Sequence, residues 1–136
     1  MKALSGVPFT KVAPFGSRVV GCATDKSDYD YLILVRERPT TDDMADTGFK
    51  PDVDDPLYGK DFSSWRSDNV NLVFTDSESY FDATIEACEF CRKYKVYDKA
   101  DRCKVHEYFR DAVKYNKGVP DVKCNTSLLD IHDIPF

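Results

Sequence analysis

Apolar residues fall in short runs in the first half of the chain and at helical spacing in the second half. Residues 11–15 lean apolar and end at a Gly16-Ser17 turn, and residues 29–35 form a second run rich in β-branched and aromatic side chains. Short apolar runs bounded by turn residues predict β-strands. The continuous apolar second half of 29–35 predicts burial on both faces. Ser17 is expected to cap a short helix over 18–22.

A third run, residues 69–75, alternates in a way that separates two faces. Successive side chains of a strand point to opposite faces, so this run predicts a strand with one wholly apolar face. The apolar face comprises Val70, Leu72 and Phe74, and the other face comprises Asn69, Asn71, Val73 and Thr75.

Two helices are expected after this strand. Residues 76–79 supply capping residues and early acids, and the apolar positions that follow recur at helical spacing to about residue 94. A second helix is expected from about Lys99 to Tyr115, ended by Gly118 and Pro120.

Residues 36–67 show no sustained periodicity and carry three prolines and many aspartates. We expect an acidic insertion or lid loop here, within a single domain spanning 1–136, because connections of this length are usually functional or mobile. Residues 37–61 alone hold eight acidic and three basic residues, which accounts for the whole formal net charge of −5. Such a loop would gate a site, supply a metal ligand or mimic an anion for a partner.

The order of these elements predicts an α/β (α+β) domain with a small mixed β-sheet flanked by helices. A chain of 136 residues, 42% of them hydrophobic, can bury such a core without disulfides. No apolar run reaches 18 residues, so no membrane partner is expected. Five cysteines without an apolar leader indicate reduced thiols and a cytoplasmic location. The net charge disfavours nucleic acid only weakly, because the acidity belongs to the loop.

Residues 16–30 combine side chains suited to phosphate and metal chemistry. Gly16 and Ser17 offer backbone N–H groups and a hydroxyl with room for close approach, as a phosphate cradle requires. Asp28 and Asp30 enter a strand two positions apart, so both carboxylates project from one face about 6.6 Å apart. Two bare carboxylates at that separation repel by about 2.5 kcal/mol at an effective dielectric of about 20, which favours a cation between them. Hard oxygen ligands favour Mg²⁺.

These residues resemble the signature of the DNA polymerase β-like nucleotidyltransferase superfamily, and they are closest to its small stand-alone members. The resemblance rests on Gly16-Ser17-Arg18, Gly21 and Ser27-Asp28-Tyr29-Asp30, followed by an apolar strand. It is specific over residues 11–35 and extends weakly to the 69–75 strand and the two helices.

The resemblance implies a nucleotidyltransferase fold and an enzyme that uses Mg²⁺ and an NTP. Asp28 and Asp30 would bind two Mg²⁺ ions, while an acceptor hydroxyl attacks the α-phosphorus and pyrophosphate leaves. Four residues would bind the nucleotide, the first two at the triphosphate: Gly16, Ser17, Arg18 and Lys26.

The resemblance implies that Asn71 stands at the family's third carboxylate and is therefore one of the catalytic positions, although an amide brings no charge and cannot act as a base. Asp76 cannot replace it, because its position has the opposite parity to Asn71 and would face the other side of the sheet. The other possible source of a third carboxylate is the loop, through Asp54, Asp55 or Asp61. Two functions therefore stay open. One is transfer of a nucleoside monophosphate to a hydroxyl of a protein, a tRNA or a small molecule. The other is a catalytically degenerate protein that binds a nucleotide or a partner as a regulator.

A C-x₂-C spacing invites zinc, but zinc is not expected. The formal ligand set is Cys88, Cys91, Cys103 and His106. Both pairs fall within expected helices, and Cys88 and Cys91 share the apolar stripe, where free cysteines are usually buried.

Two further features have both a functional and a structural interpretation. Trp65 would stack on a base or anchor the core. Basic residues at the junction of the two helices would face an anionic ligand or lie solvated at the helix ends. The basic residues are Arg92, Lys93, Lys95, Lys99, Arg102 and Lys104.

Overall fold

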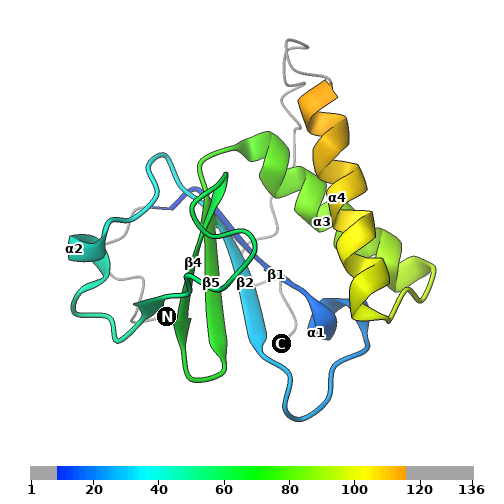
Figure 1. Ribbon diagram of the computed structural model, residues 1–136, viewed down its shortest axis with the longest axis horizontal. Coiled ribbons are helices and arrows are strands. Elements are labelled where there is room, and N and C mark those ends of the chain that lie inside the picture. The colour runs from blue at the N-terminus through cyan, green and yellow to red at the C-terminus, as the bar shows by residue number, and fades with distance from the viewer. Residues whose placement is uncertain (1–8, 116–136) are drawn as a thin grey trace.

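The computed structural model describes residues 9–115, and of Tyr115 it describes the backbone only. This part of the chain forms a five-stranded mixed sheet with the strand order β1-β2-β5-β4-β3 (Figure 1). The strands are β1 (Lys11–Phe15), β2 (Tyr29–Leu34), β3 (Lys50–Pro51), β4 (Phe62–Ser67) and β5 (Val70–Thr75). The helices are α1 (Ser17–Val20), α2 (Thr41–Met44), α3 (Glu78–Lys93) and α4 (Lys99–Tyr115).

The centre of the sheet is the parallel pair β2 and β5, and the other neighbouring strands are antiparallel. Leu32, Ile33 and Leu34 of β2 are all buried. The expected burial of this strand on both faces is therefore confirmed. Helices cover the two faces of the parallel pair and neighbouring strands cover its two edges, so water is excluded, as is usual for parallel strands.

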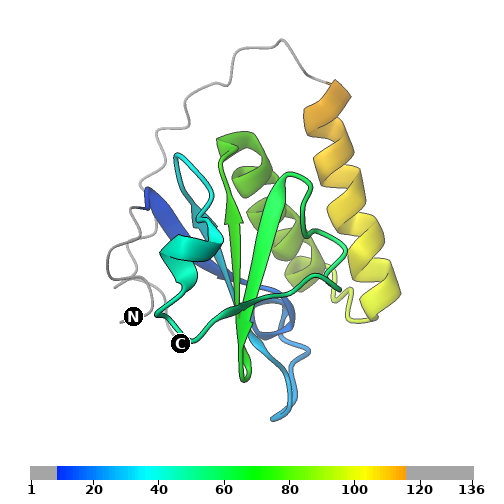
Figure 2. The same ribbon diagram turned by 60° about the vertical axis from the view of Figure 1, so that its left-hand side comes forward.

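Each face of the sheet has its own apolar cluster, and the parity of the strands assigns residues to them. Helix α2 covers one face and α3 the other, with α4 packed alongside α3 (Figures 1 and 2). The α2 face holds Val12, Ile33, Val35, Met44, Trp65, Leu72 and Phe74. The α3 face holds Ala13, Leu32, Leu34, Phe62, Val73 and Phe81. Trp65 is thus a core anchor.

Helix α3 starts as the sequence predicts, because the Ser77 side chain accepts a hydrogen bond from the Tyr80 backbone N–H. Helix α4 also matches its predicted bounds. Gly118 and Pro120, expected to end it, lie outside the described residues. Between residues 9 and 115, none of the helices is long and apolar enough to span a membrane.

The expected loop over 36–67 is wrong in its last part, where Phe62–Ser67 form β4. This strand is rich in serine and lacks an apolar run, so its stability comes from the ladder with β5 and from burial of Phe62 and Trp65. A two-residue turn joins the two strands, with Asp68 at a φ of 50°. Shorter elements, α2 and β3, also lie within the segment.

The role expected for Ser17 is also corrected. Gly16 occupies the N-cap of α1, and Ser17 is the first helical residue, without a side-chain capping bond. The helix ends at Gly21 rather than at residue 22, because Gly21 adopts the left-handed conformation with a φ of 96° and closes the last turn.

Candidate functional site

Three polar side chains form a row across three neighbouring strands. Asp30 of β2 pairs with Asn71 of β5, and Asn71 pairs in turn with Arg66 of β4. Directly paired residues project from the same face of a sheet. The parity of each strand places all three on the α3 face, beyond the apolar cluster. The strand register, rather than proximity along the chain, therefore brings these side chains together.

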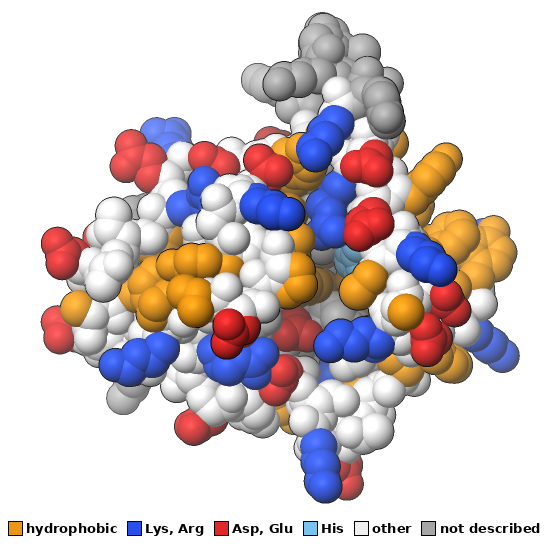
Figure 3. All heavy atoms as spheres, viewed as in Figure 1, with side chains coloured by type: hydrophobic (Ala, Val, Ile, Leu, Met, Phe, Trp, Pro, Cys, Tyr) orange, Lys and Arg blue, Asp and Glu red, His pale blue; other side chains and the backbone are white. Residues whose placement is uncertain are grey.

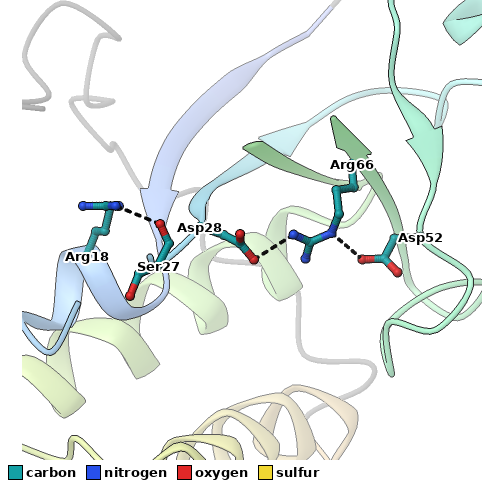
Figure 4. A network of polar contacts seen from close by, with 5 residues as sticks. All are labelled: Arg18, Ser27, Asp28, Asp52 and Arg66. Atoms are coloured by element: carbon teal, nitrogen blue, oxygen red, sulfur yellow. Dashed lines mark hydrogen bonds and ion pairs between the residues drawn. The ribbon is translucent and has the colours of Figure 1, made fainter. Parts of the chain in front are cut away.

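Arg66 joins two carboxylates that come from different parts of the chain (Figure 4). Its Nη1 donates to Asp28 Oδ2 at 2.8 Å, and its Nε donates to Asp52 Oδ2 at 3.2 Å. Both carboxylates raise the pKa of Arg66, the hydrogen bond to Asp28 most of all. One member of the Asp28–Asp30 pair therefore already has a cationic partner within the chain.

Asp30 is the more buried carboxylate of the pair. Burial is the largest cause that raises its pKa, from 3.8 to about 6. The hydrogen bond from Asn71 and the charge of Arg66 oppose this shift, whereas the charges of Asp28 and Asp55 add to it. Asp30 thus carries a poorly solvated charge at neutral pH, and a bound cation would stabilise that charge.

Asn71 is 6% exposed, and its Oδ1 has no hydrogen-bond partner among residues 9–115. Its amide bonds Asp30, so the orphan oxygen lies next to the carboxylate pair. Ser64, two residues before Arg66 in β4, is fully buried. Its Oγ likewise has no hydrogen-bond partner among the described residues. Buried polar atoms without partners cost stability, and a bound ligand or ion removes that cost.

Gly16 permits a close approach, but the group that approaches it is the Asp30 carboxylate rather than a phosphate. Its φ of 80° suits glycine, and a β-carbon there would overlap Asp30 Oδ2. A backbone hydrogen bond from Gly16 reaches the Cys88 sulfur. The amide of Gly16 therefore points toward α3, and Asp30 fills the space that the missing side chain leaves.

The other expected nucleotide-binding residues surround this turn. The Arg18 guanidinium stacks on Tyr29 at 3.8 Å from the ring centroid and donates to the Ser27 carbonyl at 2.8 Å. Arg18 therefore braces the loop that leads to Asp28. Ser17 is half-buried beside Gly16, and Lys26 is exposed at the tip of the loop.

The four residues of the formal zinc set do not meet. Cys88 Sγ lies 3.8 Å from His106 Nε2, but Cys103 is exposed. Burial raises the pKa of Cys88 to about 11 and, together with Arg110 and Arg102, lowers the pKa of His106 to about 4. Both groups are therefore neutral at pH 7, and they form a packed pair between α3 and α4.

A third carboxylate does not complete the site. Within the described part of the chain, no group of three His, Cys, Asp or Glu side chains is arranged to hold a metal ion. Asp55 influences the pKa of Asp30, so the loop does approach the site, whereas Asp54 and Asp61 are exposed. The carboxylates at this point of the sheet are those of Asp28 and Asp30, whose oxygens are of the type that a hard cation such as Mg²⁺ prefers.

Two residues of this site were missed from the sequence, Arg66 and Asp52. The available signal was the alternation of β4, in which Arg66 has the same parity as Phe62 and Ser64. Nothing in the local sequence connects Arg66 with Asp28, because the contact depends on the order of the strands.

A hollow opens between the sheet and α4 (Figure 3). Acidic side chains lie inside it, with basic side chains around its rim and a histidine in its wall. Most of the basic residues at the helix junction are exposed, as solvated helix ends are, but Arg102 is half-buried and influences the pKa values of Cys88 and His106.

Comparison of the chain with protein-family models, with curated proteins and with solved structures returned no match.

Proposed function

We propose that this chain is a Mg²⁺-dependent nucleotidyltransferase with the DNA polymerase β-like fold, which transfers a nucleoside monophosphate from an NTP to a hydroxyl of a protein, a tRNA or a small molecule. One observation carries the proposal. Asp28 and Asp30 lie together at the entry of β2 beside Gly16, and Asn71, which bonds Asp30, has a buried Oδ1 without a partner among the described residues. A cytoplasmic location, where thiols stay reduced, is part of the proposal.

Each residue has a physical role in this proposal. Asp28 and Asp30 hold the metal, and Asn71 adds a neutral oxygen. Mg²⁺ supplies charge neutralisation at the transferred phosphorus and activation of the acceptor hydroxyl. Gly16 and Ser17 would bind the triphosphate next to the metal. Arg18 acts indirectly, because it braces the loop from Thr24 to Ser27 that positions Asp28.

A second function is favoured by a specific observation. Asn71, which pairs with Asp30, stands where the resemblance implies a third carboxylate, and Arg66 pairs with Asp28. Both features reduce the negative charge available to metal ions and remove a candidate base. They support a degenerate site that binds a nucleotide, or a partner protein, without transferring the nucleotide.

Label transfer separates the two functions. The protein is incubated with Mg²⁺, the four α-labelled NTPs and a cell lysate, beside the Asp28→Asn/Asp30→Asn double variant. Asp25→Asn is the matched control, because Asp25 is an exposed aspartate on the same loop. Labelling that disappears only in the double variant supports the transferase. Binding of nucleotide without transfer under Mg²⁺ or Mn²⁺ supports the nucleotide-binding regulator. Absence of both overturns the transferase and the nucleotide-binding regulator.

A further inference from the structure

We propose that Arg66 couples metal binding to nucleotide binding: it neutralises Asp28 in the absence of ligands, competes with the metal for that carboxylate, and pairs with phosphate oxygens of the nucleotide once the metal displaces it. This inference rests on the function proposed above and adds a residue that the sequence motif does not contain.

The two ion pairs of Arg66 differ in exposure. The side chain of Asp28 is 36% exposed, whereas that of Asp52 is 18% exposed. The Asp28 pair is the shorter one, at 2.8 Å against 3.2 Å, but its greater exposure makes it the pair that solvent screens more strongly and that an incoming ligand can reach. The Asp52 pair would keep the guanidinium beside the site after its separation from Asp28. Arg66 is therefore a tethered cation that can change partner without leaving.

Competition follows from charge. A divalent cation at Asp28 and Asp30 places two positive charges next to the guanidinium that bonds Asp28 Oδ2. Two cations on one carboxylate repel each other, so metal binding costs the ion pair between Arg66 and Asp28. Metal alone offers the displaced guanidinium no new partner, and binding of metal alone is weakened by that cost.

A nucleotide removes the cost. The planar guanidinium presents several N–H donors in a fixed fork, which matches phosphate oxygens as well as carboxylate oxygens. Nε stays on Asp52 while the Nη groups are free to bond the anion. Metal and nucleotide consequently bind more tightly together than either does alone. Because such coupling is reciprocal, each ligand raises the affinity of the other by the same factor.

The experiment measures Mn²⁺ binding by electron paramagnetic resonance, first without nucleotide and then with the four uncleavable α,β-methylene NTPs. The variants are Arg66→Gln, Arg66→Lys and, as a control at an exposed arginine, Arg92→Gln. Arg66→Gln is expected to bind Mn²⁺ alone about three- to tenfold more tightly than the native protein, the size expected for loss of a partly exposed ion pair. It should also lose most of the enhancement by nucleotide. Arg92→Gln should behave like the native protein.

The Arg66→Lys variant separates the effect of the guanidinium's geometry from the effect of its positive charge. Lysine keeps the positive charge at Asp28 but cannot hold two carboxylates in the geometry of the guanidinium. Its affinity for Mn²⁺ alone should stay as low as that of the native protein, while the enhancement by nucleotide falls. Circular dichroism in EDTA checks that each variant is folded.

The outcomes separate this inference from the proposed function. If native protein binds Mn²⁺ with nucleotide and Asp28→Asn abolishes binding, the nucleotide site stands. In that case, unchanged or weaker Mn²⁺ affinity in Arg66→Gln overturns the role of Arg66 alone. Binding of Mn²⁺ by Arg66→Gln but not by native protein supports the competition. Failure of both proteins to bind Mn²⁺ under any condition overturns the inference together with the site on which it rests.

Discussion

The carboxylate of Asp30 lies in the space that a side chain on Gly16 would occupy. Gly16 directly follows β1 and caps α1, and Asp30, the second residue of β2, lies directly opposite Phe15. The antiparallel pairing of β1 with β2 creates this contact. A glycine at position 16 is consequently a requirement of the site as well as of the turn.

Gly16→Ala should destabilise the protein by about 2–4 kcal/mol, from a positive φ and from overlap with Asp30. Gly48→Ala is the matched control, since Gly48 has a φ of 82° but open space around its β-carbon position. The control should lose only about 1–2 kcal/mol, the cost of the left-handed conformation. Urea denaturation measures both losses. Equal losses in the two variants would show that the contact with Asp30 has no energetic consequence.

Asp30→Asn should make the protein more stable at neutral pH in the absence of metal. The folded state raises the pKa of Asp30 from 3.8 to about 6, so it disfavours the charged form. The contribution of Asp30 to stability is therefore fully present below about pH 3.8 and is lost as the pH rises through 6. The variant should exceed native protein by on the order of 1–3 kcal/mol at pH 7 in EDTA.

The measurement is the difference in unfolding free energy between native protein and Asp30→Asn from pH 3.5 to pH 7.5. Asp25→Asn, at an exposed position, should show no such trend. A difference that stays constant over the whole range would contradict a buried, ionising Asp30.

His106 should make the protein sensitive to acid. Burial, with Arg110 and Arg102, lowers the pKa of His106 from 6.5 to about 4, so the folded state favours the neutral ring beside Cys88. Its contribution to stability is present above pH 6.5 and is lost as the pH falls toward 4. His106→Gln should be less stable than native protein at pH 7.5. The difference in unfolding free energy between the two proteins should shrink by on the order of 1–3 kcal/mol at pH 4.

Thermal unfolding across this pH range tests the role of His106, with Cys88→Ala as the control that keeps the imidazole. The control should retain the acid sensitivity of native protein. A gap between native protein and His106→Gln that does not depend on pH would refute the assignment.

Asn71→Asp should test the missing carboxylate. Without metal, a buried third carboxylate beside Asp30 should cost about 1–3 kcal/mol of stability. Mg²⁺ should then raise the melting temperature more in this variant than in native protein, because one more negative ligand binds the cation. Asn69→Asp, at an exposed position on the same hairpin, is the control. A gain in nucleotide transfer supports the transferase. Intact nucleotide binding without any gain favours the regulator.

Local sequence determined three of the strands and both long helices of this protein. The apolar runs predicted β1, β2 and β5 to within one residue at each end, and the Ser77 cap predicted the start of α3. The proximity of Asp28 and Asp30 was also predictable from the sequence, whereas the space at Gly16 proved to be filled by Asp30. These features depend on residues that are close along the chain, because turn residues and the alternation of side chains set local structure directly.

Tertiary structure alone decided which side chains meet the carboxylate pair. Strand β4 was invisible as a pattern because half of its residues are serines, and its place beside β5 sets Arg66 next to Asn71. Asp52 reaches Arg66 from the acidic segment through β3, which pairs with β4. Strand order and register are collective properties of the sheet, fixed by burial of two apolar faces, and no local sequence window contains them.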